Sequence, residues 1–104
     1  MTLKELNCGC NRLTSLNNLS PTLKQLYCSW NRITSLDNLP PTLKILNCEN
    51  NSISNLNNLP STLKILEIRK VFDVGYCNFN QSIDNLPFGL EELYISYNKC
   101  FKQS

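Results

Sequence analysis

The sequence predicts a repeat solenoid of the α/β class in the broad sense, with about five coils in a single domain spanning residues 1–104. Three observations predict it. Similar segments recur every twenty residues, as TLKELNCGCNRLTSLNNLS, TLKQLYCSWNRITSLDNLP and TLKILNCENNSISNLNNLP. The same positions of each segment are apolar, and an Asn follows them at a fixed spacing. A period in this range indicates one supersecondary unit stacked on copies of itself.

Each unit opens with a predicted short strand. Its apolar positions follow the pattern LxxLx(C/I)xxN. In the first unit Leu6 and Cys8 are two residues apart, so both point toward the core, whereas Asn7 and Gly9 point outward. Stacking of such strands gives a short parallel sheet on the concave face of the solenoid.

An Asn ends each predicted strand, at Asn11, Asn31, Asn51 and, after a break, Asn98. Its short amide can hydrogen-bond backbone groups of its own coil and of neighbouring coils that would otherwise be buried without a partner. We therefore expect these side chains to form a ladder that turns the chain away from the sheet.

The rest of each unit is the predicted return path on the convex side. About ten residues cross it, and they contain Leu or Ile at regular positions that fill the coil interior. Prolines also lie on this path, which argues against a full α-helix and favours extended or short 3₁₀ segments with little regular helix. These prolines are Pro21, Pro40, Pro41, Pro60 and Pro87.

The pattern LxxLx(C/I)xxN resembles the signature of leucine-rich repeat proteins. The units LPxTLKxLxCxxNxITxLxNLP are similar to the short-repeat class best known from bacterial effectors. FNQSIDNLP at 79–87, with FKQS at 101–104, looks like the FNIP repeat. Mixed arrays of this kind are typical of social amoebae and of the giant DNA viruses that infect amoebae. The resemblance implies a binding module and, for a virus, a host protein as the partner.

The fourth unit is irregular. Leu63 and Leu90 are twenty-seven residues apart, and the excess lies at 69–78. Val71 stands where an Asn would continue the ladder. Insertions in repeat proteins map to loops on one face and often contact partners. A register adjuster between the two repeat types is an equally good explanation of this segment.

Six cysteines raise the question of a metal or redox site. Cys8, Cys28 and Cys48 occupy the inward position that Ile68 and Ile95 take later, so we expect buried, reduced thiols stacked about 5 Å apart. Disulfides between neighbours are conceivable but disfavoured in the cytosol. The spacing does not match zinc sites, and no metal or cofactor is predicted. Outside this row lie Cys10, which we expect to face solvent, and Cys77 and Cys100.

Composition argues against an enzyme. The chain has no His, and its three glycines are scattered, so neither a nucleophilic triad nor a phosphate-binding loop is predicted. A net charge of +2 is too small to imply nucleic acid or an anionic membrane as partner. No apolar run approaches a membrane span, and the amino end begins within a repeat without a signal-peptide core. We expect a cytoplasmic protein, in the host cytoplasm if it is viral.

The predicted working surface is the concave strand face. Large amphipathic aromatic residues exposed on a sheet are the types that anchor interfaces, and polar residues lie between them. Alternatively, these rings only cover neighbouring strands. A row of Lys4, Lys24, Lys44 and Lys64 beside them is expected to keep the rim solvated. The candidate partner-binding residues are Tyr27, Trp30, Asn47, Glu49, Asn50, Glu67, Arg69, Tyr94 and Tyr97.

The sequence therefore predicts a non-enzymatic module that binds a protein partner, with a structural or self-assembling repeat protein as the alternative and a redox or metal protein as a remote third. No amphipathic cap precedes the first coil, so we expect Leu3, Leu13 and Leu16 to be uncovered. Because each coil buries its apolar cross-section against the next, we also expect a homodimer through a terminal coil, above all the amino-terminal one.

Overall fold

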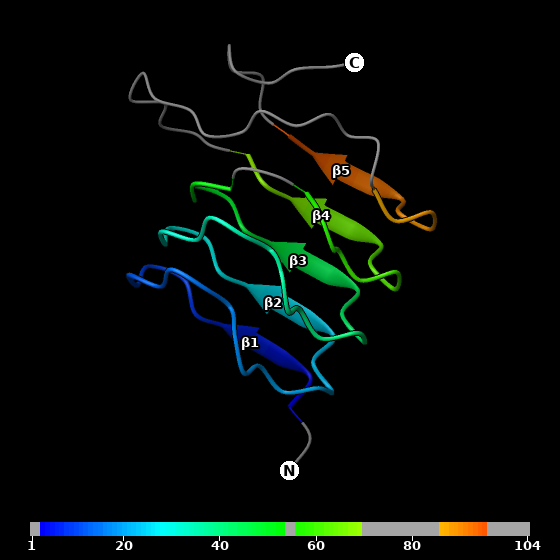
Figure 1. Cartoon of the computed structure of the whole chain (residues 1–104), viewed down its shortest axis with the longest axis horizontal. Coiled ribbons are helices and arrows are strands. Elements are labelled where there is room, and N and C mark those ends of the chain that lie inside the picture. The colour runs from blue at the N-terminus through cyan, green and yellow to red at the C-terminus, as the bar shows by residue number, and fades with distance from the viewer. Residues whose placement is uncertain (1–2, 54–55, 70–85, 96–104) are drawn as a thin grey trace.

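The computed structural model describes residues 3–53, 56–69 and 86–95. Five short strands stack in chain order in one sheet, and every neighbouring pair is parallel (Figure 1). The described residues contain no helix, and extended chain with turns connects the strands. The predicted solenoid with a parallel sheet and little regular helix is therefore confirmed. The strands are β1 (Glu5–Asn7), β2 (Gln25–Tyr27), β3 (Ile45–Asn47), β4 (Ile65–Glu67) and β5 (Glu92–Tyr94).

The central Leu of each strand points into the core, as the alternation of side chains predicts. Leu26, Leu46 and Leu66 are fully buried and lie beside one another in register. Leu93 continues this row on β5, although the chain between β4 and β5 is longer than the other connections. The longer fourth unit therefore returns the chain to the same register.

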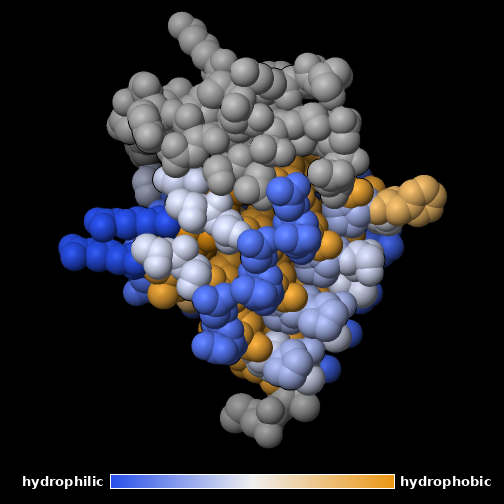
Figure 2. All heavy atoms as spheres, viewed as in Figure 1, coloured by the Kyte–Doolittle hydropathy of each residue, from blue (hydrophilic) through white to orange (hydrophobic). Residues whose placement is uncertain are grey.

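The core is a strip of Leu, Ile and Cys side chains that runs through the stacked coils. Leu23, Leu43 and Leu63 have no exposed surface, and burial of each such side chain stabilises the fold by about 1.5 to 3 kcal/mol. Burial falls at the β1 end, where Leu3 is 38% exposed and Leu13 is 37% exposed. Leu16, which was also expected to be uncovered, is instead buried in the core. Equivalent residues of successive coils lie above one another, and Figure 2 shows hydrophilic side chains in a column that crosses the coils.

The predicted asparagine ladder is present at Asn11, Asn31 and Asn51. The Nδ2 group of Asn51 donates to the carbonyl oxygens of Cys28 at 3.0 Å and Cys48 at 3.1 Å. Its Oδ1 atom accepts a hydrogen bond from the Ile33 backbone N–H at 3.0 Å. The amides of Asn31 and Asn51 thus each join their own coil to the preceding one, whereas the Asn11 amide bonds carbonyl oxygens of its own coil. Asn98, the expected fourth member, lies outside the described residues.

Threonine hydroxyls form a second set of contacts between coils, at Thr22, Thr42 and Thr62. The Thr62 Oγ1 atom donates to the Leu43 carbonyl oxygen at 2.7 Å, and Thr42 does the same to Leu23 at 2.7 Å. These threonines lie in β-turns that also contain the predicted prolines, closed for example by the Leu43 N–H and the Pro40 carbonyl oxygen at 3.2 Å. The repeat pattern alone did not predict this role for the threonines.

Candidate interaction face

The outward face of the sheet, opposite the core, carries the predicted row of side chains. The strand register places Tyr27 beside Asn47, Asn47 beside Glu67, and Glu67 beside Tyr94. Tyr94 is 38% exposed, whereas Tyr27, Asn47 and Glu67 are half-buried. The predicted order of these four residues on the face is confirmed.

The sequence pattern did not lead us to predict a second row of outward side chains. These residues lie two positions before the first row on each strand, and a period of two therefore places them on the same face. Ile45 and Ile65 form its centre, side by side in register and half-buried. Counting back two residues from Asn47 and Glu67 would have found them. The full row is Glu5, Gln25, Ile45, Ile65 and Glu92.

Two tyrosines flank Asn47 and Glu67, one on β2 and one on β5. The Tyr27 hydroxyl donates to Gln25 Oε1 at 2.7 Å, and the Tyr94 hydroxyl donates to Glu92 Oε1 at 2.5 Å. Each tyrosine is thus fixed to a residue of its own strand. The pKa of Tyr94 is raised, first because its hydroxyl donates to Glu92 and then because the carboxylate charge opposes ionisation of the phenol.

Polar side chains of β3 and β4 are also held by contacts between the coils. Asn47 Nδ2 donates to Glu67 Oε2 at 2.6 Å, while Asn47 Oδ1 accepts from the Glu49 backbone N–H at 3.2 Å. The Arg69 Nε atom forms an ion pair with Glu49 Oε2 at 2.6 Å. Its guanidinium carbon lies 5.4 Å from the centre of the Tyr94 ring. Glu49 is the main cause of the raised Arg69 pKa.

Trp30 occupies a different local structure from the strand residues. It lies three residues after Tyr27, where the chain leaves the sheet, and its backbone φ of 59° is in the left-handed region. Cys10 and Asn50 occupy the equivalent positions, with φ angles of 61° and 58°. The Trp30 side chain is 45% exposed, so a large aromatic surface lies at the edge of the face.

Side-chain contacts join five of the predicted residues, and backbone hydrogen bonds add two more. The Trp30 N–H donates to the Glu49 carbonyl oxygen at 3.0 Å, and the Asn50 N–H donates to the Arg69 carbonyl oxygen at 2.8 Å. Tyr27 lies across Asn47 and Glu67 from Tyr94. Tyr97 lies outside the described residues, as does the predicted insertion at 69–78 apart from Arg69. The contacting set is Asn47, Glu49, Glu67, Arg69 and Tyr94.

Two of the three cysteines of the predicted inward row are buried as expected, and the third, Cys8, is only partly buried. Cys28 and Cys48 are fully buried free thiols with their sulfur atoms 2.9 Å apart, and Cys10 is exposed, as predicted. The hydrogen bond to Cys48 and burial raise the pKa of Cys28, which keeps the thiol protonated. Cys8 is half-buried, and its pKa is also raised, mainly by burial. No group of three His, Cys, Asp or Glu side chains in the described ranges could hold a metal ion.

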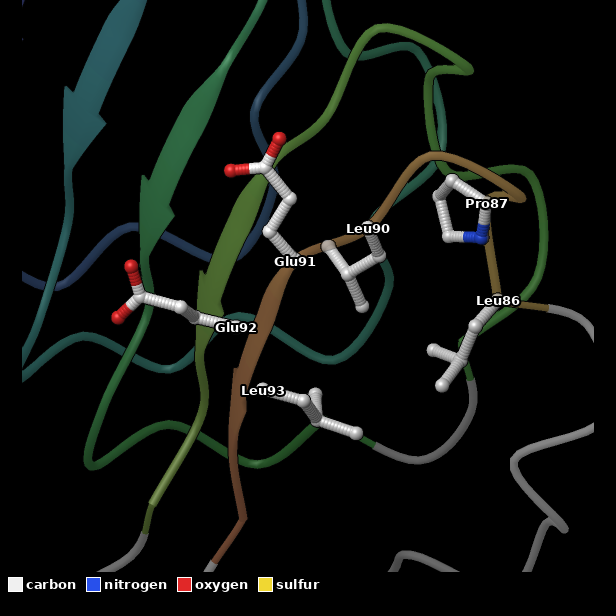
Figure 3. A pocket seen from close by; sticks show the side chains of 6 residues that line it. All are labelled: Leu86, Pro87, Leu90, Glu91, Glu92 and Leu93. Carbon is white, nitrogen blue, oxygen red and sulfur yellow. The ribbon is translucent and has the colours of Figure 1, made fainter.

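A cavity of about 250 Å³ lies at β5. Leucines and a proline line much of it, and Figure 3 shows the carboxylates of Glu91 and Glu92 on the opposite side of the chain from these apolar side chains. The cavity therefore presents mainly apolar surface. The lining residues are Leu86, Pro87, Leu90, Glu91, Glu92 and Leu93.

Comparisons with protein-family models, with curated proteins and with solved structures gave no match. In the part of the chain that the structure describes, no helix has the length and apolar character needed to cross a membrane.

Proposed function

We propose that this protein is a non-enzymatic interaction module that binds a protein partner through the outward face of its sheet. The observation that carries the proposal is the set of contacts among Glu49, Arg69 and Tyr94, which fixes three large side chains from three coils before a partner arrives. Fixed side chains lose less conformational entropy on binding. Tyr and Arg are also the residue types that most often dominate binding energy.

The proposed contact surface includes the aromatic residues on both sides of β3 and β4, which are Tyr27 and Trp30 on one side and Tyr94 on the other. The repeat pattern resembles that of leucine-rich and FNIP arrays, which supports a host protein as the partner if the chain is viral. A cytoplasmic location belongs to the same proposal, because the free thiols at Cys28 and Cys48 suit a reducing compartment. The proposed residues are Tyr27, Trp30, Asn47, Glu49, Asn50, Glu67, Arg69, Tyr94 and Tyr97.

Affinity capture with matched variants tests the proposal. Wild type, Tyr94→Ala and Phe88→Ala are immobilised at equal density, and retained proteins are quantified by mass spectrometry. Phe88 is a suitable control because its side chain is fully exposed in the turn before β5, outside the strand face. We expect a set of proteins that wild type and Phe88→Ala retain and that Tyr94→Ala loses, with affinity reduced by about 2 kcal/mol, or roughly thirtyfold.

Circular dichroism melting of the same three proteins separates binding from folding. Tyr94→Ala should melt close to wild type, since the Tyr94 side chain is exposed. Equal capture by all three proteins would contradict the proposal. A large fall in the melting temperature of Tyr94→Ala would assign this ring a structural role instead.

Self-assembly is the second candidate, and the exposed Leu3 and Leu13 side chains at the β1 end favour it. Apolar surface of this kind is covered when two sheets meet end to end. Sedimentation velocity over a wide concentration range, with Leu3→Lys as the control, tests it. A dimer that forms in wild type and is absent in Leu3→Lys supports self-assembly, and a wild type that stays monomeric excludes it.

A further inference from the structure

We infer that the segment bound by this face is a basic extended peptide, with an apolar side chain on Ile45 and Ile65 and a Lys or Arg against Glu67. This inference rests on the proposed function and adds the chemistry of the partner. Ile45, Ile65, Glu67 and Glu92 are referred to below as the central strip.

Ile45 and Ile65 give the central strip its apolar part. They are neighbours in register, and both remain half-exposed on the outward face. Gln25 and Glu92 lie beside them on β2 and β5, and each accepts a hydrogen bond from the tyrosine hydroxyl of its own strand. Since adjacent strands lie about 4.8 Å apart, β2 and β5 are about 14 Å apart, which leaves room for one extended chain between the rings.

Carboxylates give the central strip its charge. Glu67 accepts a hydrogen bond from the neutral amide of Asn47, and Glu92 accepts one from the neutral hydroxyl of Tyr94. The only ion pair within the described ranges joins Arg69 to Glu49. Neither Glu67 nor Glu92 is part of that ion pair, although the Arg69 guanidinium lies close enough to interact with the Glu67 carboxylate at longer range. A carboxylate has about four acceptor sites, so each can still bind a cation from a partner.

The spacing along the strand selects an extended partner. Ile65 and Glu67 are two residues apart, and both point outward, so they are separated by about 6.6 Å. An extended peptide presents its residues i and i+2 on one side at the same spacing. An apolar residue at i and a basic residue at i+2 therefore match Ile65 and Glu67 together.

The lysine row carries positive charge, which would attract an acidic peptide instead of a basic one. Lys44 and Lys64 precede β3 and β4, at the rim of the face, and Lys64 Nζ lies 3.5 Å from the Gly89 carbonyl oxygen. An acidic peptide would bind at this rim, whereas a basic peptide would bind over the central strip. The two positions are distinguishable by measurement.

Three synthetic peptides test the inference: SLSKSLSKS, SLSESLSES and SSSKSSSKS. On one side of an extended chain, the first peptide carries leucines and lysines, the second carries leucines and glutamates, and the third carries lysines without leucines. Each is titrated into isotopically labelled protein, and binding is followed by amide chemical shifts at 50 mM and 500 mM NaCl. We expect SLSKSLSKS to bind at least tenfold more tightly than the others and to shift Ile45, Ile65 and Glu67. High salt should weaken it because it screens exposed charges.

Two variants with the same charge change localise the effect. Glu67→Gln keeps an oxygen acceptor for Asn47 Nδ2 but removes the negative charge. Glu5→Gln removes one negative charge from the same outward face, at β1. We expect Glu67→Gln to weaken SLSKSLSKS binding at least fivefold and Glu5→Gln less than twofold. Equal effects of the two variants would overturn the inference.

The remaining outcomes separate the inference from the proposed function. Tighter binding of SLSESLSES, or no binding of any peptide, would overturn the basic partner. The proposed function would still stand if Tyr94-dependent capture persisted. Equal capture by wild type, Tyr94→Ala and Phe88→Ala would reject the proposed function as well, whatever the peptides do.

Discussion

Trp30 is the residue whose backbone least suits its side chain. Left-handed backbone costs a residue with a Cβ atom about 1 to 2 kcal/mol, and Asn tolerates it better than bulky residues do. Asn50 occupies the same position one coil later with a nearly identical φ angle. Strained residues cluster at functional sites, so the left-handed backbone of Trp30 favours a role for its side chain in recognition.

Trp30→Asn should therefore raise the free energy of unfolding by about 1 kcal/mol while weakening partner binding. Urea denaturation followed by circular dichroism measures the first effect, and the capture assay measures the second. A variant less stable than wild type would show that contacts of the indole ring outweigh the backbone strain.

Asp37 links two coils through an exposed carboxylate. Its Oδ1 atom accepts a hydrogen bond from Asn58 Nδ2 at 2.9 Å, and Asn17 accepts the equivalent bond from Asn38 at 3.0 Å in the preceding coil. The hydrogen bond from Asn58 is the main reason why the pKa of Asp37 is lowered, with Ser35 contributing next. The ionised carboxylate is thus favoured in the folded state.

This shift predicts a dependence of stability on pH. A lowered folded-state pKa stabilises the protein fully above the ordinary carboxyl pKa of about 3.9, and the contribution is lost as the pH falls through the folded-state value. Asp37→Asn keeps an oxygen that can accept the hydrogen bond from Asn58 but removes the carboxyl group that titrates. Its free energy of unfolding, measured from pH 2.5 to pH 6, should fall less on acidification than that of wild type. Identical slopes would mean that Asp37 does not contribute.

At the scale of the element, the asparagine ladder closes each strand. Asn51 is buried and serves one N–H donor and several carbonyl oxygens of two coils, whereas Asn11 is exposed and contacts only the carbonyl oxygens of Cys8 and Gly9. The same side chain therefore has different importance in the two coils.

Asn51→Ala should lower the free energy of unfolding by about 3 kcal/mol, because the Ile33 N–H and the Cys48 carbonyl oxygen would be buried without partners. The Cys28 carbonyl oxygen would keep its hydrogen bond from Asn31 Nδ2. Asn11→Ala should cost less than about 1 kcal/mol, since water can replace its hydrogen bonds. Both values come from chemical denaturation, and similar losses for the two variants would contradict this role.

The strands and their inward residues could be predicted from the sequence because the period fixes them. Leu6, Leu26 and Leu46 lie exactly one repeat apart, and burial then follows from alternation. The left-handed backbone at Cys10, Trp30 and Asn50 could not be predicted in this way, because these three residues share no chemical property. The geometry of the coil imposes their backbone angles. Contacts such as Arg69 with Tyr94 depend on side-chain conformations that a repeat pattern does not specify.

At the scale of the whole molecule, each strand pairs only with its neighbours in the chain order. Stability in such an array is a sum of contributions from the coils and from the interfaces between them. A residue in the middle of the described stack has partners on both sides, whereas one in β1 has a described strand on one side only. Position in the stack therefore determines how much a given substitution costs.

Leu46→Ala should consequently cost about 3 kcal/mol or more, because Leu46 is fully buried and its loss leaves a cavity. Leu6→Ala should cost about 1 kcal/mol, since Leu6 is only half-buried. Hydrogen exchange of both variants locates the loss. Exchange that increases only around β1 in Leu6→Ala supports independent coils, and uniform loss of protection throughout the chain would contradict it.

The threonine contacts between coils have an evolutionary consequence. Thr42 binds the Leu23 carbonyl oxygen and Thr62 binds the Leu43 carbonyl oxygen with the same geometry, so the interface between two coils is the same at both places. A duplicated twenty-residue segment would bring its own threonine and meet a matching carbonyl oxygen. Unequal recombination can thus lengthen or shorten the gene by one coil at a time without requiring a compensating substitution.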